Sequence, residues 1–150
     1  MKTKYLLFLF LAGFCFKANA QFTTLLNADG PNLFFPYGTP ISDGTFLYVM
    51  TTYGGVNDDG TIFKVLPDGT GYQKIFDFDD VTTGKNPMGS LFFDGTFLYG
   101  MTGSGGINSS MGTIFKIKPD GTMFSKLFDF SGTDGGRPYY GHLISDGTFL

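Results

Sequence analysis

The chain has 150 residues, 13 acidic and ten basic, with a formal net charge of −3 at pH 7. This acidic balance argues against nucleic acid as a partner. A single cysteine and a single histidine exclude a disulfide framework and a Cys/His metal cluster.

The first 20 residues have the pattern of a secretory signal peptide. Lys2 and Lys4 precede an apolar run over 5–16, and residues 18–20 read Ala-Asn-Ala. The run is shorter than the roughly 20 residues that a membrane span needs. We therefore expect a secreted, extracellular or cell-surface protein that begins at Gln21, with no transmembrane span once the signal is removed.

The remaining part of the chain is rich in residues that form turns. All 13 acidic residues are Asp, and the chain contains 23 Gly and 19 Phe. Asp and Gly favour turns whereas Glu and Ala favour helices, so the composition predicts short strands joined by tight turns around a Phe-rich core. Without the three basic residues of the signal, seven basic and 13 acidic residues remain, so the formal net charge is 7 − 13 = −6.

The organising feature is a tandem repeat. Residues 94–145 repeat 43–93 with 27 identities in 51 aligned positions, leaving Met111 unpaired, and a third copy opens at 146–150. Each repeat is expected to hold four antiparallel strands. These are 45–51, 61–66, 72–78 and 90–93 in the first copy and 96–102, 113–118, 124–130 and 142–145 in the second.

Four strands in 51 or 52 residues match the size of a propeller blade, since kelch blades take about 50 residues. The predicted fold is all-β, a partial, kelch-like β-propeller. Two full blades span about 39–78 and 90–130, and a third starts over 141–150. Residues 22–26 precede the first blade as an outer strand that would close the ring, although a disordered leader is an open alternative. Both faces of the first strand are apolar, and we expect Phe97, Tyr99 and Met101 to be covered by the preceding blade.

The connections predict a binding side. Two of the four are tight Asp-Gly turns in both copies, while 52–59 and 79–88 are longer and differ between copies. Alternate connections of a meander share a side, so the long loops gather on one rim, where loops carry function. The predicted structural turns are Asp43-Gly44, Asp68-Gly69, Asp94-Gly95, Asp120-Gly121 and Asp146-Gly147.

On that rim the predicted ligand site comprises Tyr53, Asn57, Arg137, Tyr139 and Tyr140. Aromatic and planar groups suit stacking on sugars or contact with a protein surface. Packing of these groups against a neighbouring blade is an equally open interpretation.

No catalytic residue, metal site or cofactor is predicted. The segment 57–60 is rich in oxygen ligands for calcium, but its counterpart 108–112 lacks both carboxylates, so an ordinary turn is the favoured interpretation. His142 has no partner of the kind that a catalytic base needs.

The strings DGTFLYGMT, GTIFKIKPDGT and FDF between Asp94 and Phe130 resemble the repeat of the GloVer-containing choice-of-anchor family of bacterial extracellular proteins. This resemblance implies a secreted protein with many propeller-like repeats, often followed by an anchoring or sorting segment. It supplies no catalytic residues. With two full copies and no anchor, the sequence is expected to be truncated.

Two functional hypotheses follow. The favoured one is a secreted, non-enzymatic repeat module that binds a glycan or a surface protein through the long-loop rim, together with the remaining blades of the full-length protein. The alternative is a propeller-based polysaccharide lyase or hydrolase whose remaining blades or catalytic domain lie outside this sequence.

Overall fold

The computed structural model describes residues 24–25, 35–108 and 110–150. The expected signal peptide lies outside the described residues, as do three of the five residues of the expected N-terminal strand. Among the described residues, no helix is long and apolar enough to cross a membrane.

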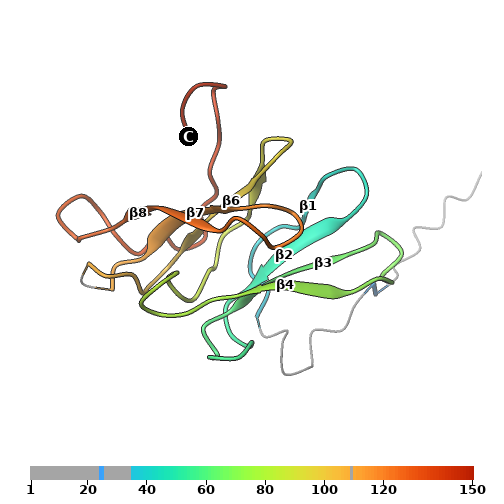
Figure 1. Ribbon diagram of the computed structural model, residues 1–150, viewed down its shortest axis with the longest axis horizontal. Coiled ribbons are helices and arrows are strands. Elements are labelled where there is room, and N and C mark those ends of the chain that lie inside the picture. Colours follow the sequence, from blue (N-terminus) through green and yellow to red (C-terminus); the bar gives the residue numbers. More distant parts are fainter. Residues whose placement is uncertain (1–23, 26–34, 109) are drawn as a thin grey trace, which may run out of the picture.

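Eight strands form two antiparallel four-stranded sheets, and the described residues contain no helix (Figure 1). The first sheet consists of β1 (Ile41–Ser42), β2 (Leu47–Thr51), β3 (Thr61–Val65) and β4 (Gln73–Asp77). The second consists of β5 (Phe92–Phe93), β6 (Leu98–Thr102), β7 (Thr113–Ile117) and β8 (Ser125–Asp129). Each sheet follows chain order from its short strand. The prediction of an all-β fold built from four-stranded antiparallel units is confirmed.

The two sheets share even their irregularities. β3 and β4 shift register between Ile62 and Phe63, and β7 and β8 shift between Ile114 and Phe115. The extra residue of a bulge bends a strand and increases its twist, so both sheets curve at the same place.

Residues 142–145, the fourth strand expected of the second copy, do not form a strand. His142 makes only an isolated parallel bridge to Ser90. β1 is a strand because Ile41 pairs with Tyr48 on β2. The position that would pair in this way with Ile144 follows Leu150, so the ladder that defines a strand does not form.

The Asp-Gly turns are held by one repeated hydrogen-bond pattern. The Asp43 carboxylate accepts hydrogen bonds from the N–H groups of Thr45 (2.7 Å) and Phe46 (2.8 Å) and from the Tyr48 hydroxyl (2.7 Å). Asp94 accepts the same three bonds in the second copy. The glycines that follow have φ of +94° and +97°, a region open to glycine at little cost.

We expect these turns to make stability fall in acid. Burial raises the pKa of Asp43, but the bonds from Phe46, Tyr48 and Thr45 outweigh it and hold that pKa below its usual value of 3.8; Asp94 behaves alike. A carboxyl group with a lowered folded-state pKa stabilises the fold above the unfolded-state pKa and loses this contribution as the pH falls through the folded-state value. The urea midpoint should therefore stay level between pH 7 and 5 and fall below about pH 4. The Asp43→Asn/Asp94→Asn variant should show a smaller fall, and an equal fall would show that these carboxyl groups do not contribute.

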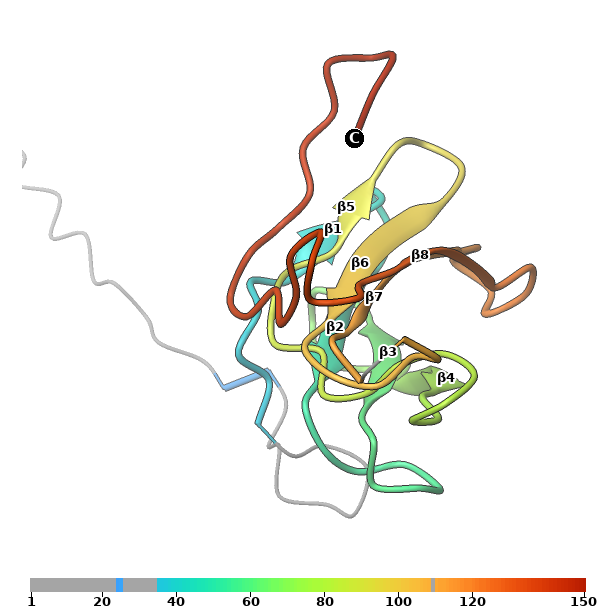
Figure 2. The same ribbon diagram turned by 90° about the vertical axis from the view of Figure 1, so that its left-hand side faces the viewer.

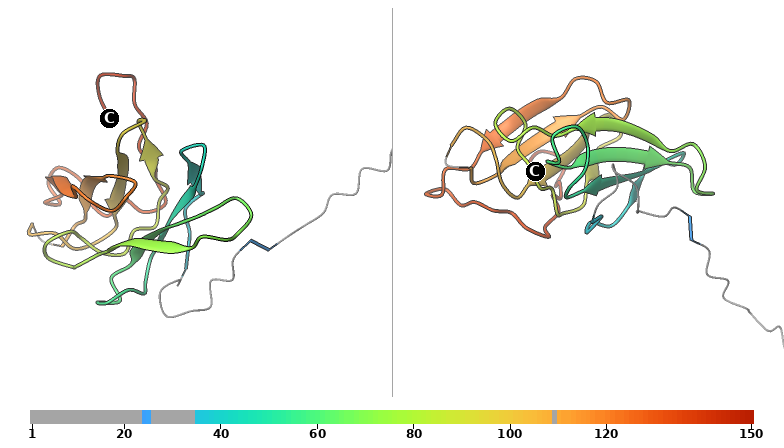
Figure 3. Two further views of the ribbon diagram at one scale, coloured as in Figure 1. Left: turned by 45° about the vertical axis from the view of Figure 1, so that its right-hand side comes forward. Right: turned by 90° about the horizontal axis from the view of Figure 1, so that it is seen from below.

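The main core lies between the sheets. Tyr48, Met50, Ile62 and Phe78 of the first repeat pack with Leu98, Phe115 and Ile117 of the second, all 2% exposed or less. Aromatic rings cross this interface: Phe78 contacts Phe115 edge-on at 5.3 Å, and Phe76 stacks on Phe124 at 4.6 Å. Figure 3 shows the two sheets beside each other.

This packing corrects the expected orientation. The Tyr48 side of the first sheet faces the following repeat, so Leu98, and not Tyr99, faces the preceding one. Tyr99 and Met101 lie on the opposite face of the second sheet and are half-buried. Period-2 alternation could not resolve this, because both faces of the strand are apolar.

Glycine backbones bring the starts of the repeats together. A Cβ atom at Gly38 would collide with the carbonyl oxygen of Gly89, and one at Gly89 with that of Gly141. The Thr39 N–H donates to Ser90 Oγ (2.8 Å), and the Ser90 N–H donates to the Gly141 carbonyl (3.2 Å). β1 and β5 consequently lie side by side (Figure 2).

The tight turn between β3 and β4 and the equivalent turn between β7 and β8 each lie against the backbone of an earlier segment of the chain. A Cβ at Gly121 would collide with the carbonyl of Ile75 on β4, and one at Gly69 with the carbonyl of Leu25. Leu25 therefore takes the place relative to Gly69 that Ile75 takes relative to Gly121. Thr24 and Leu25 themselves carry no strand assignment.

Candidate functional site

The long connections meet on one side of the sheets. In each antiparallel sheet the tight turns join β1 to β2 and β3 to β4, so the connections 52–60 and 78–91 leave from the opposite end. Residues 130–141 leave β8 at the corresponding end. The close approach of Gly38, Gly89 and Gly141 draws the ends of these loops together.

Five aromatic side chains gather there, and we call Phe35, Tyr37, Tyr53, Tyr139 and Tyr140 the aromatic cluster. Phe35 stacks on Tyr37 with centroids 6.0 Å apart and meets Tyr53 edge-on at 5.9 Å. Tyr37 meets Tyr140 edge-on at 5.7 Å, and Tyr140 contacts Tyr139 at 6.3 Å. The rings thus form one connected set drawn from three segments far apart in the sequence.

The aromatic cluster is open to solvent. Tyr53 and Tyr139 are 40% and 41% exposed, Tyr37 and Phe35 are 53% and 56%, and Tyr140 is 68%. Apolar side chains scattered singly on a surface need no explanation, but a contiguous exposed group marks an interaction site. Four of the five rings also carry a hydroxyl group that can donate or accept a hydrogen bond.

Unusual backbone conformations place these rings. Phe35, Asn86 and Arg137 each precede a proline, and each has a positive φ of 51° to 56°. Tyr140 has φ 59°. Left-handed backbone at non-glycine residues costs of the order of 1–3 kcal/mol and persists where surrounding contacts impose it, often at functional sites.

Hydrogen bonds between loops impose this conformation. The Phe35 carbonyl accepts from the Thr52 N–H (3.2 Å), as the Asn86 carbonyl accepts from the Gly103 N–H (3.1 Å). The Arg137 N–H donates to the Met111 carbonyl at 2.7 Å. Each of these segments is therefore hydrogen-bonded to a residue close to a strand, and these bonds hold the backbone beside the aromatic cluster.

The Tyr139 ring packs directly against the backbone of Gly103. A Cβ atom at Gly103 would collide with the Tyr139 ring. The first copy has Thr52 at the equivalent position, so only the second repeat can receive a ring there. This packing leaves Tyr139 41% exposed, which means that it is anchored along one side and accessible along the other.

The acidic loop residues serve as backbone acceptors. Asp58 accepts the Gly54 N–H within its own loop (2.7 Å), and Asp59 accepts the N–H of Asp80 from the other long loop (2.9 Å). Asp77 accepts the Val56 N–H (3.1 Å) and pairs with Lys74 at 2.8 Å. In the described part of the chain, no three His, Cys, Asp or Glu side chains group to hold a metal ion.

The structure brings three of the five predicted ligand residues together, namely Tyr53, Tyr139 and Tyr140, through the rings of Phe35 and Tyr37. Arg137 is exposed beside Pro138 in the same loop. Asn57 is not part of the aromatic cluster, because its amide donates to the Phe78 carbonyl at the end of β4 (3.2 Å).

Phe35 and Tyr37 were missed from the sequence, although a signal for them exists. Phe35-Pro36-Tyr37-Gly38, before the first copy, matches Asn86-Pro87-Met88-Gly89 near the end of that copy. Because 79–88 is one of the long loops, the match between Pro36-Tyr37-Gly38 and Pro87-Met88-Gly89 already implies aromatic residues on the rim. The second copy has Pro138-Tyr139-Tyr140-Gly141 at this place, with one residue more between proline and glycine.

The sequence model of the Gloeobacter/Verrucomicrobia repeat matches residues 11–150. The chain belongs to this repeat family. The match confirms the resemblance drawn from the strings in residues 94–130. No curated protein and no solved structure shows significant similarity to the chain. The family repeat therefore accounts for the two copied sheets, whereas the aromatic cluster arises at positions where the copies differ.

Proposed function

We propose that this chain belongs to a secreted, non-enzymatic repeat module that binds a glycan through the aromatic cluster. The observation that carries the proposal is the contact of five exposed rings from three loops. The apolar C–H face of a sugar ring packs well on an aromatic face, and tyrosine hydroxyl groups supply hydrogen bonds at the ring edge.

In this proposal the two sheets are successive blades of a β-propeller, with β1 and β5 as inner strands. The close approach of the glycine backbones at 38, 89 and 141 supports a common axis. The aromatic cluster then lies where the inner strands begin. The predicted signal peptide supports export, where extracellular or cell-surface polysaccharide is the accessible ligand.

A glycan is a better match than a protein ligand on two grounds. The aromatic cluster contains four tyrosines and one phenylalanine, so each tyrosine adds a hydroxyl group to the apolar platform. Its exposed rings are also held by backbone that is already ordered. A preorganised platform suits a small ligand, since little conformational entropy is lost on binding.

Removing rings from the aromatic cluster should weaken binding. The test is isothermal titration of the exported chain with soluble oligosaccharides of glucose, xylose, N-acetylglucosamine and galacturonate. Tyr53→Ala and Tyr140→Ala should each lower the affinity for the oligosaccharide that binds by about tenfold, equivalent to about 1.4 kcal/mol.

Tyr72 provides the matched control, since it is 39% exposed but lies at the start of β4 against Phe63. Tyr72→Ala should leave the affinity unchanged. Equal affinity of the Tyr53→Ala/Tyr140→Ala double variant and the parent chain would refute the site, and binding of a protein partner alone would refute the ligand class.

A further inference from the structure

The second sheet carries an exposed copy of the surface that is buried in the first. Its outward face consists of Tyr99, Met101, Ile114, Phe128 and Phe130, and we call it the outer face. The corresponding residues of the first sheet are Tyr48, Met50, Ile62, Phe76 and Phe78, so all five side chains are identical. Cross-strand pairing is also the same, with Met101 opposite Ile114 and Ile114 opposite Phe128.

The two surfaces differ only in what covers them. Tyr48, Met50, Ile62 and Phe78 are 2% exposed or less, and Phe76 is partly buried, because the second sheet packs on them. On the outer face, Phe128 is 41% exposed and the other four residues are half-buried. The neighbouring Leu127 is 43% exposed, whereas its counterpart Ile75 is packed against the core.

A positioned cation accompanies the apolar side chains. Lys64 lies over the Phe46 ring (4.7 Å) and donates from Nζ to the Pro119 carbonyl in the turn of the next repeat (3.4 Å). Lys116 lies over the Phe97 ring at the same 4.7 Å. The outer face therefore presents the same donor for the turn of a further repeat.

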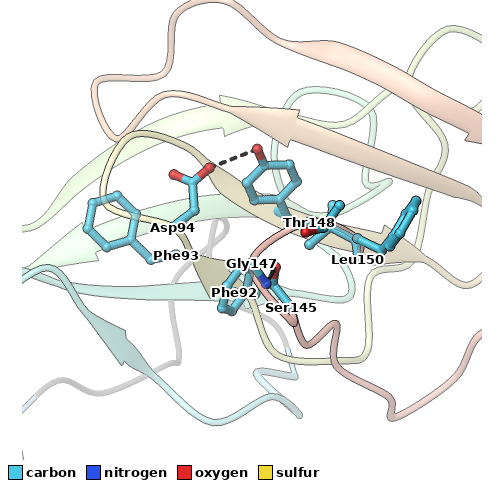
Figure 4. Close-up of a pocket in the computed structure, with 9 residues that line it drawn as sticks. Phe92, Phe93, Asp94, Ser145, Gly147, Thr148 and Leu150 are labelled. Atoms are coloured by element: carbon cyan, nitrogen blue, oxygen red, sulfur yellow. Dashed lines mark hydrogen bonds between the residues drawn. The ribbon is translucent and has the colours of Figure 1, made fainter.

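The start of the third copy already follows the required path. Ser90 makes a parallel bridge to His142, and the preceding position, Thr39, lies beside Ser90 through its N–H bond to Ser90 Oγ (2.8 Å). Phe92, Tyr99, Thr148, Phe149 and Leu150 all line one open pocket. Figure 4 shows this pocket, with Phe92, Thr148 and Leu150 among its labelled residues. In the first interface the residues at the positions of Tyr99 and Leu150 are Tyr48 and Leu98, which are 1% and 0% exposed. The same space there is packed.

We propose that the outer face is the docking surface for the four-stranded sheet of a further family repeat that continues from residues 142–150. The interface would reproduce the one between the existing sheets. Leu127 would contact the glycine of the further repeat that is equivalent to Gly121. Phe128 and Phe130 would contact the equivalents of Phe124 and Phe115, and Lys116 would donate to the equivalent of the Pro119 carbonyl.

A second copy of this chain is the less suitable occupant. The matching surface it would offer is the face of its first sheet, where Gly69 corresponds to Gly121. Leu25 already lies against Gly69 as Ile75 lies against Gly121, so this seat is occupied. The outer face has no such cover from the described residues.

The test uses an extended chain in which residues 94–145 are duplicated after Ser145. Phe128→Asp is introduced into the 150-residue chain and into the extended chain, and Phe76→Asp is the matched variant in the interface that already exists. In the 150-residue chain, Phe76→Asp should lower the urea midpoint strongly and Phe128→Asp hardly at all. In the extended chain, Phe128→Asp should lower the midpoint as much as Phe76→Asp does.

Two further measurements do not depend on the folding of a variant. The unsubstituted extended chain should unfold at a higher urea concentration than the 150-residue chain, and it should bind less anilinonaphthalene sulfonate per repeat. An unchanged Phe128→Asp midpoint in the extended chain, or no gain on extension, would overturn the proposal. The 150-residue chain could instead form a dimer that Phe128→Asp abolishes and that persists in the extended chain. That result would identify a second copy of the chain as the occupant of the outer face and would overturn the proposal.

Discussion

Phe78→Ala should lower the free energy of unfolding by about 3–5 kcal/mol, the usual cost of truncating a fully buried phenylalanine. Phe78 is completely buried and contacts Phe76 at 5.2 Å and Phe115 at 5.3 Å, so it links both sheets. The cavity would lie at the centre of the interface, where rigid strands on both sides prevent collapse. Urea denaturation followed by circular dichroism measures the change.

The repeat supplies an internal control for that substitution. Phe130 occupies the position of Phe78 in the second sheet, contacts Phe128 at 5.2 Å, and is half-buried on the outer face. Phe130→Ala removes the same atoms from the same local setting without opening a cavity between sheets. It should cost less than half as much, and equal costs would show that burial between the sheets is not the source of stability.

Gly121→Val should destabilise the chain by more than about 1 kcal/mol, because two costs act together. Gly121 has φ +86°, which a β-branched residue adopts only with strain. The added Cβ would also collide with the Ile75 carbonyl on β4, so the sheets would have to separate locally. Gly69→Val should behave similarly, with φ +84° and the Leu25 carbonyl in the way.

Gly95→Val separates the two costs. Gly95 has φ +97°, but the space around its Cβ position is empty to 4 Å. Gly95→Val therefore adds backbone strain alone, and it should lower the free energy of unfolding less than Gly121→Val does. If Gly95→Val and Gly121→Val had the same midpoint, the contact between the turn and the neighbouring sheet would contribute nothing measurable.

The repeat and its strands could be predicted because their determinants are local. Asp-Gly and Pro-Asp-Gly turns specify hairpins through a few adjacent residues, and a repeated sequence must form a repeated unit. The predicted first strand began at Thr45, whereas β2 begins at Leu47. The difference arises because the Thr45 and Phe46 N–H groups bond to the Asp43 carboxylate instead of a neighbouring strand.

The orientation of the sheets was not accessible in this way. Leu47 and Val49 are as apolar as Tyr48 and Met50, so hydrophobicity could not tell which set meets the following repeat. The distinguishing contacts join distant residues, such as Lys64 Nζ to the Pro119 carbonyl. Such contacts follow from packing and have no signature in a single strand.

The candidate site was predicted in part. Tyr53, Tyr139 and Tyr140 followed from one rule, that long variable loops share a rim. Their assembly depends on Phe35 and Tyr37, which lie before the first full copy and were not included in the predicted ligand site. It also depends on the close glycine contacts that bring Tyr37 within reach of Tyr140, which no local pattern indicates.

The most direct test of glycan binding at the aromatic cluster is an NMR titration of the exported chain with selectively labelled tyrosine rings, using the oligosaccharide found by calorimetry. We expect the ring signals of Tyr37, Tyr53, Tyr139 and Tyr140 to shift together and saturate at one stoichiometric equivalent. Signals of Tyr48, Tyr72 and Tyr99, which lie away from this rim, should not move. Shifts at Tyr72 or Tyr99 with none in the aromatic cluster would contradict the account.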